Sequence, residues 1–508
     1  MIELNNWHPM PRYGVAAALV SKGQSNIEYP ADRGVLWELA KDVLPQLLDY
    51  VMLCPHKTDN LEFVVFRPVP SGELNPGKAS GQTSANGFYI APHVLSSQNA
   101  ADIVKEVKGI YATLMKEDKE SNYELKKSFA PMIAKINAGK KSMSNPKIDV
   151  LKAAFTAIAT LTKLKAAAFI KDTSDNFGNA GILPDLPFFD AESSSYPLIE
   201  FIELVDEIMS QGLGDDAFTS KMDKNSYNRP KVFYGNYPHA PRTFGLGSLS
   251  LVAAIGKWVE EHNNLYGKAS AVLDWLSGRP IYIVSYLGTQ QERFGHHLID
   301  LALSGDLYQI IQMTSRVELI GIPSDTKFSN PKWQLFLRSF DHFLRLFDAS
   351  SWQNFLMHRA TYPIEFFHLF KTYFMKTGKY TDELIESAVA YGRSLNRAAY
   401  LAGKENAGES ASIKAVTEAK QKVMLQLESI IQSAETNQEL VARLNAQVGR
   451  LTFQDIDSKA SLFLKEVVNG KIGLEESQHL ITAFMRLSSY DPNEQKGNKL
   501  EVEENQTA

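Results

Sequence analysis

Cysteine is almost missing from this chain: Cys54 is the only one among 508 residues. A single thiol excludes a disulfide framework and a metal cluster of several cysteines within the chain. It suits a reducing compartment, so we expect a cytoplasmic protein. Long uncharged apolar runs are missing too, because the most apolar stretch, 151–170, is interrupted by three lysines. The first residues show no signal pattern, and we expect no membrane partner.

Recognisable catalytic motifs are absent as well. The sequence contains no Gly-x-Ser-x-Gly elbow, no His-Glu-x-x-His, no Cys-x-x-Cys and no lysine at the Walker spacing. His296, His297 and Asp300 form the one tight cluster of metal-type side chains, without a further ligand nearby. We therefore predict no catalytic residue, no metal and no cofactor. A metal-dependent nucleic-acid enzyme built on this cluster is the alternative.

Charges are sorted along the chain although they nearly cancel, with a net charge of -5. A basic block, 126–171, contains ten lysines and one acid, and an acidic block, 172–220, contains eleven acids and no lysine or arginine. Either the two blocks neutralise each other within the fold, or one meets a polyanion and the other a basic partner. An ammonium group attracts phosphate but lacks the planar fork that reads bases. The predicted contacts to a nucleic-acid backbone in this block are Lys126, Lys127, Lys140, Lys141 and Lys147.

Two polar stretches are candidates for contact with bases. The first, 71–87, contains four glycines and no acid after Glu73. The second, 221–247, alternates cations, amides and tyrosines, a mixture that contacts both backbone and bases. An ordinary surface loop is the alternative in both cases. From side-chain chemistry alone, we predict DNA contacts, including contacts to a recognition motif, for Lys78, Gln82, Asn86, Asn228, Arg229, Lys231 and Arg242.

The clearest pattern lies in 381–489, where helical spacing recurs after short polar breaks. Such breaks favour an antiparallel bundle, because a short connection cannot carry the chain far. Thr381 should cap the first helix, and a later helix should start at Thr436 and end at Gly449. The first helix has an apolar face. The simplest interpretation of its other side is a face exposed only to solvent. We predict that the cations of this other side contact nucleic-acid backbone: Arg393, Arg397 and Lys404.

The expected fold class is α+β, mainly α, with a mixed N-terminal domain of short strands and a C-terminal antiparallel helical bundle. Within the N-terminal region we expect a strand at 14–19 and an alanine-rich helix at 149–171. The expected parts are a mixed α+β nucleic-acid-binding region at 1–329, aromatic-rich connecting helices at 330–380, the bundle at 381–489 and a disordered tail at 490–508.

The run from Ile385 to Leu401, with the predicted bundle that closes the chain, resembles the large subunit of Cascade-type CRISPR effector complexes. It is most similar to the type I-B branch, including variants carried by transposons. The resemblance implies a non-catalytic subunit whose N-terminal part binds the 5′ end of the guide RNA and reads the PAM, a short motif in duplex DNA. The bundle would lie along the hybrid of guide and target, and base pairing would supply the sequence specificity.

The implied partners are the guide RNA (crRNA), target double-stranded DNA, other Cascade subunits, and a recruited nuclease-helicase or transposition proteins. In some relatives the bundle is also made separately from an internal start, and Met357 and Met375 are suitably placed for one. A protein-only helical scaffold, whose charged blocks bind basic and acidic partners, is the remaining alternative.

Overall fold

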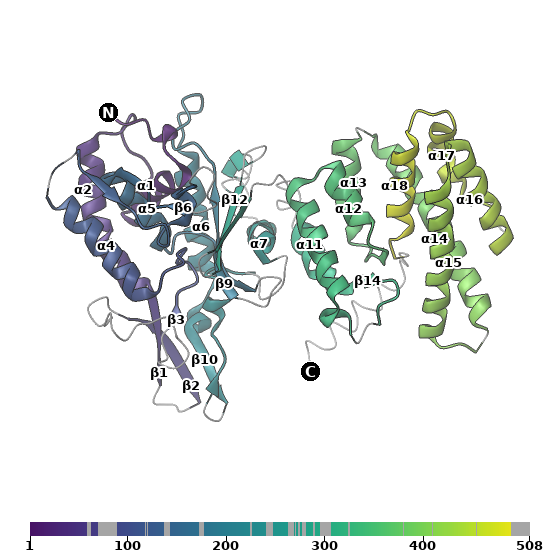
Figure 1. The fold of residues 1–508 in the computed structure, drawn as a ribbon, viewed down its shortest axis with the longest axis horizontal. Helices are drawn as coiled ribbons and strands as arrows, with labels where there is room; N and C mark the ends of the chain where they lie inside the picture. The colour runs from purple at the N-terminus through teal and green to yellow at the C-terminus, as the bar shows by residue number, and fades with distance from the viewer. Residues whose placement is uncertain are drawn as a thin grey trace. The chain divides into compact units, whose positions relative to one another are not determined.

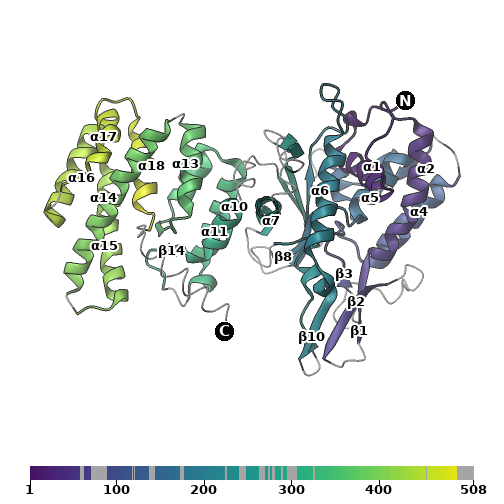
Figure 2. The ribbon, with the colours of Figure 1, turned by 180° about the vertical axis from the view of Figure 1, so that it is seen from behind.

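The computed structural model of the chain divides into two compact units (Figures 1 and 2). The N-terminal unit contains Met1–Tyr308 with Leu344–Leu346, and the C-terminal unit contains Gln309–Phe343 with Phe347–Ala508. The structure describes all residues except 58–61, 70–88, 117, 119, 137–142, 172–176, 224–225, 240–246, 263–268, 270, 273–274, 277–280, 288–289, 295–305, 324–325, 379, 409, 454 and 489–508. The predicted tail at 490–508 therefore lies outside the described residues.

Helices that pack on α5 form the core of the N-terminal unit. Helices α1, α2 and α4 contact α5, and α6 contacts α1. Asn99 and Asp149 cap α4 and α5, because each side chain accepts hydrogen bonds from backbone N–H groups of the first turn. The helices are α1 Pro9–Ser21, α2 Arg33–Val43, α4 Ala100–Leu114, α5 Val150–Leu161 and α6 Pro197–Gly212.

The contact between α1 and α5 is close at Gly14. A Cβ atom added there would lie 1.8 Å from the carbonyl oxygen of Phe155. The expected strand at 14–19 is wrong, since these residues belong to α1 and are buried. A short apolar run without a polar face has the same pattern in a buried strand and in a buried helix, so periodicity could not separate the two.

Two antiparallel sheets complete the N-terminal unit. The strand order is β11-β10-β2-β1-β3 in the five-stranded sheet, whose β1, β2 and β10 project away from the helices in Figure 1. It is β13-β12-β9-β8 in the four-stranded sheet, on which α7 (Gly247–Glu261) packs. The strands are β1 Met52–Lys57, β2 Phe63–Pro68, β3 Tyr89–Ile90, β8 Ala167–Lys171, β9 Phe177–Pro184, β10 Thr219–Asp223, β11 Ser226–Tyr227, β12 Ile281–Leu287 and β13 Gln290–Phe294, with the short pairs β4 Asn122–Glu124 and β7 Lys147–Asp149, and β5 Lys135–Ile136 and β6 Met143–Ser144.

The expected helix at 149–171 is wrong in its second half, because α5 ends at Leu161 and strand β8 follows. Lys165 lies in the connection and is fully buried. Its ammonium group satisfies carbonyl oxygens near the C-terminus of α5, which helps the helix to end there. Burial lowers the pKa of Lys165. This lysine of the basic block therefore serves the fold, through hydrogen bonds to the carbonyl oxygens of Ala159 (2.5 Å), Thr160 (3.0 Å) and Thr162 (3.0 Å).

Aromatic side chains fill the first half of the C-terminal unit. The rings interlock closely: the ring centroids of Trp352 and Tyr373 are 4.5 Å apart, and those of Phe340 and Phe355 are 4.9 Å apart. We call this group the aromatic core; its buried members are Trp333, Phe336, Phe340, Phe343, Trp352, Phe355, Tyr362, Phe366, Phe370, Tyr373 and Phe374. The elements around it are α10 Asp306–Met313, α11 Pro331–Leu346, α12 Ala349–Leu356, α13 Phe366–Thr377 and the strand pair β14 Glu318–Leu319 and β15 Ala360–Thr361.

Helix α14 (Asp382–Ala407) packs against every helix that follows it in the described chain. Thr381 caps α14 as predicted, since its side chain accepts a hydrogen bond from the N–H of Leu384. The predicted end at Gly449 is wrong: α16 continues to Thr452, and Phe453 ends it in the left-handed conformation. The following helices are α15 Ile413–Ser433, α16 Asn437–Thr452, α17 Ser461–Val468 and α18 Leu474–Met485.

A buried ion pair joins the bundle to the aromatic core. Arg486 follows α18 and Glu428 lies on α15; their side chains are each 1% exposed, and Arg486 Nε lies 2.7 Å from Glu428 Oε1. Arg486 Nη1 also donates hydrogen bonds to the carbonyl oxygens of Leu356 (2.7 Å), the last residue of α12, and His358 (3.0 Å), two residues beyond it. One side chain thus connects three segments of the C-terminal unit.

The predicted fold class, α+β and mainly α, is confirmed. None of the described helices combines the length and the apolar character that a membrane crossing needs.

Candidate nucleic-acid interface

Several predicted contact residues lie outside the described residues. They are Lys78, Gln82 and Asn86 of the first polar stretch, Arg242 of the second, and Lys140 and Lys141 of the basic block. The cluster of His296, His297 and Asp300 also lies outside. Within the described part of the chain, no group of three or more His, Cys, Asp or Glu side chains could hold a metal ion.

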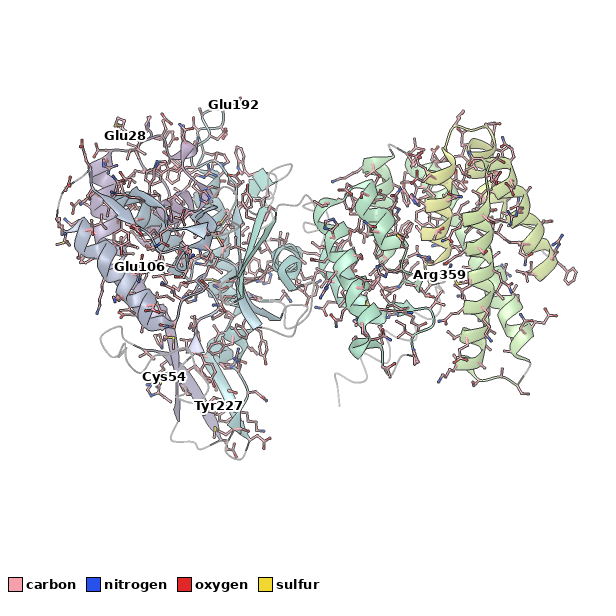
Figure 3. All side chains as sticks on the ribbon, viewed as in Figure 1. Glu28, Cys54, Glu106, Glu192, Tyr227 and Arg359 are labelled. Atoms are coloured by element: carbon pink, nitrogen blue, oxygen red, sulfur yellow. The ribbon has the colours of Figure 1, made fainter. Side chains whose placement is uncertain are left out.

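The five-stranded sheet brings the flanks of the two polar stretches together. Residues 70–88 connect β2 to β3, and the second stretch begins in β10, which pairs with β2. Tyr89 starts β3, and its ring lies 5.3 Å from that of Phe233 in the second stretch. Tyr227 of β11 packs edge-on against Phe66 of β2. Figure 3 labels Tyr227 and Cys54 on this sheet. The distance between the flanking strands in the sequence could not have predicted that they share one sheet.

Arg229 lies where the two sheets of the N-terminal unit meet. Its guanidinium carbon is 4.3 Å from the ring centroid of Phe169, which belongs to β8 of the four-stranded sheet. Tyr89 of the five-stranded sheet and Phe233 surround it at 5.5 Å and 6.0 Å. Burial lowers the pKa of Arg229, and the neighbouring Tyr89 and Tyr234 oppose this effect. Cation–π contacts of this kind hold a guanidinium in one place without an acidic partner.

Asn228 and Lys231 flank Arg229 in the sequence, but only one of the two side chains already has a partner among the described residues. Asn228 is exposed, and its backbone carbonyl accepts a hydrogen bond from Ser220 Oγ. Lys231 is exposed but pairs with Asp216, with Nζ 2.6 Å from Oδ2. This hydrogen bond lowers the pKa of Asp216. Asn228 therefore offers a free amide to a ligand, whereas Lys231 already has a carboxylate.

The described lysines of the basic block are engaged to different extents. Lys126 pairs with the buried carboxylate of Glu106, which is 2% exposed, at 3.4 Å. Lys127 is exposed, and its ammonium donates a hydrogen bond to the carbonyl oxygen of Met143 at 3.1 Å. Lys147 is exposed on β7. Lys127 and Lys147 are thus better placed than Lys126 to meet an anion.

Several charge pairs among the described residues join one of the two blocks to a residue outside it. Lys126 of the basic block pairs with Glu106, and in the acidic block Asp216 pairs with Lys231 and Asp185 with Arg12. None of these three pairs joins one block to the other.

Helix α14 displays the predicted row of cations. Arg393, Arg397 and Lys404 are exposed, and none of them pairs with an acid among the residues that the structure describes. Tyr400, 45% exposed, lies in the same row. The opposite face of α14 is buried by the other helices, which fixes the row on the surface of the bundle.

A comparison with known families decides what kind of protein carries these surfaces. The model of one family, described as CRISPR-associated protein Csp2, matches residues 8–488. The chain belongs to this family. Csp2 proteins are subunits of Cascade-type complexes, so this chain is a Cascade-type subunit. Neither a curated protein nor a solved structure matches it.

Sequence reasoning missed two features of this Csp2-family chain. It placed Arg229 on a polar surface without its ring partners, because Phe169 lies 60 residues earlier in a segment expected to be helical. It also missed the pair of Glu428 and Arg486. A local signal existed for Arg486, since it directly follows the apolar end of α18, but nothing in the sequence named its partner.

Proposed function

We propose that this chain is the large, non-catalytic subunit of an RNA-guided DNA-binding complex, and that it recognises the PAM, holds the 5′ end of the guide RNA and supports the guide–target R-loop. The family match over residues 8–488 carries the proposal. The N-terminal unit would contact duplex DNA around Asn228 and Arg229, and the cation row of α14 would follow a phosphate backbone. Pairing with the guide would supply sequence specificity, so the protein needs only backbone contacts and a few groove contacts.

We place the subunit in the type I-B branch on the resemblance of 385–401, and its complex would serve either defence or transposition. Its partners would be guide RNA, target DNA, the other Cascade subunits and a recruited nuclease-helicase or transposition machinery. The proposed backbone contacts are the exposed cations Lys127, Lys147, Arg393, Arg397 and Lys404.

Copurification tests the proposed function directly. Tagged full-length protein, expressed with the genes that neighbour its own, should bring down several partner proteins and a discrete short RNA. Sequencing that RNA should show guides with a common repeat-derived 5′ end. A complex that is free of nucleic acid at low salt would refute the proposal and would favour a protein-only scaffold.

Substitution of the cation row tests the role of the bundle. The double variant Arg393→Ala/Arg397→Ala should weaken target binding regardless of sequence, because both side chains would contact phosphates. The slope of log K against log salt concentration should become shallower by about 0.9 for each phosphate of duplex DNA that the variant no longer neutralises, or by about 0.7 for each phosphate of a single strand. Binding of the assembled complex to target DNA, measured at several salt concentrations, gives this slope.

Arg443→Ala is the matched control for this double variant. Arg443 lies on α16 and its guanidinium pairs with Glu439 at 3.0 Å, so its removal should leave the salt slope unchanged. If the double variant and the control behave alike, the α14 row contacts something other than nucleic acid.

A further inference from the structure

Arg229 has free hydrogen-bond donors although it is half-buried. Among the described residues, no acceptor receives a hydrogen bond from its guanidinium and no carboxylate pairs with it. None of its nitrogen atoms is buried without a partner, so the donors reach solvent. Lys231, two residues away, is neutralised by Asp216. A guanidinium that is held on rings, has no counter-ion in the part of the chain that the structure describes and keeps its donors free is suited to bind an anion.

The position of Arg229 argues against reading of base edges. A side chain that reads a base must enter a groove that is about 8.5 Å deep in B-DNA. The guanidinium instead lies against Phe169 at 4.3 Å and is flanked by Tyr89 and Phe233, at the junction of two sheets. Fixed in this way, it can meet only a group that comes to the protein surface, and the outermost anions of a nucleic acid are its phosphates.

We infer that Arg229, held between the rings of Phe169, Tyr89 and Phe233, forms a subsite for a single backbone phosphate of the bound nucleic acid. The planar fork of the guanidinium can donate two parallel hydrogen bonds to phosphate oxygens, while its face stays on Phe169. The phosphate would fix the register of the strand beside the exposed amide of Asn228. Arg229 is then a positioning residue, and any contact with a base falls to its neighbour. The inference rests on the proposed function, since it takes the phosphate to belong to nucleic acid.

Replacement of single phosphates tests the subsite without any change to the protein. The probe is a series of target duplexes. Each duplex carries a single neutral methylphosphonate linkage, and its position moves along the PAM-proximal strands from one duplex to the next. At one linkage, the wild-type complex should bind about tenfold more weakly, and the Arg229→Gln variant should show no further weakening at that linkage. Equal weakening of the wild type and the variant at every linkage would overturn the inference.

Two further variants separate a binding role from a structural one. Arg229→Lys keeps the charge on the rings but removes the fork, so it should keep the salt slope and bind more weakly than the wild type. Lys41→Gln is the control and should leave the slope unchanged, because Lys41 lies on α2, pairs with Glu38 and belongs to none of the predicted contacts. Arg229→Gln should make the slope shallower by about 0.9.

The outcomes distinguish the failure of this inference from failure of the proposed function. If wild-type complex binds DNA and Arg229→Gln lowers only the melting temperature while the salt slope stays the same, Arg229 is a brace between the two sheets and the inference falls. If Arg229→Gln changes the preference for flanking bases at constant slope, the side chain reads bases and the inference also falls. If the wild-type complex contains no nucleic acid, the proposed function itself falls.

Discussion

Replacing Arg486 by methionine should destabilise the C-terminal unit by about 3–5 kcal/mol, because it leaves the carboxylate of Glu428 buried without its cation. The substitution also removes the donor for the carbonyl oxygens of Leu356 and His358. Hydrogen exchange of the α14 and α15 amides in the full-length protein measures the destabilisation, since these helices cannot open without exposing the pair.

The chain offers a matched control around the same carboxylate. Arg359 Nε lies 3.8 Å from Glu428 Oε2, but its side chain is 50% exposed, so Arg359→Ala should cost less than about 1 kcal/mol. The double variant Arg486→Met/Glu428→Met removes both charges and should recover part of the stability. A single Arg486→Met variant as protected from exchange as the wild type would contradict the importance of the pair.

Gly14→Ala should destabilise the N-terminal unit by about 3 kcal/mol, the upper end of what overpacking of a core costs. The added methyl group would lie 1.8 Å from the carbonyl oxygen of Phe155, and backbone cannot swing away as the end of a side chain can. Alanine favours helix over glycine by about 1 kcal/mol, which offsets only part of the clash. The midpoint of thermal unfolding and the hydrogen exchange of the α1 and α5 amides measure this loss of stability.

Gly449→Ala is the contrasting case of the same substitution. Gly449 lies within α16, and a Cβ atom added there would meet nothing within 4 Å. This variant should be more stable in the bundle by up to about 1 kcal/mol. If both substitutions moved stability in the same direction, helix preference and not the close approach of α1 and α5 would govern them.

Local signals in the sequence were enough to locate much of the bundle. The spacing of apolar residues and the cap at Thr381 predicted α14 and its exposed cations, because amphipathic periodicity is a property of one helix. The same reasoning failed at 14–19 and at 149–171. In the first case the helix is buried all round and shows no polar face. In the second case a buried lysine, Lys165, helps to end the helix through hydrogen bonds to backbone carbonyls. A count of charges in the sequence assumes that such a lysine is exposed to solvent.

The sequence predicted some residues of the candidate site but not their contacts. Residue chemistry singled out Arg229 and Asn228, but the contacts that give Arg229 its character come from strands β3 and β8, far from it in sequence. Pairing of distant strands follows from tertiary packing, which no local pattern in one sequence encodes. The distinction between the free Asn228 and the neutralised Lys231 depends likewise on a partner, Asp216, that lies in the acidic block.

The aromatic core has a consequence for any shorter polypeptide translated from within this reading frame. A product that begins at Met375 would carry the whole bundle but would leave α11, α12 and most of α13 behind. Phe484 would no longer meet the rings of Phe367 and Phe374, and Arg486 would be without two backbone acceptors. Such a product would expose an apolar surface to water beside the charged side chain of Arg486. We therefore expect the shorter polypeptide to be stable only where a neighbouring subunit covers that surface.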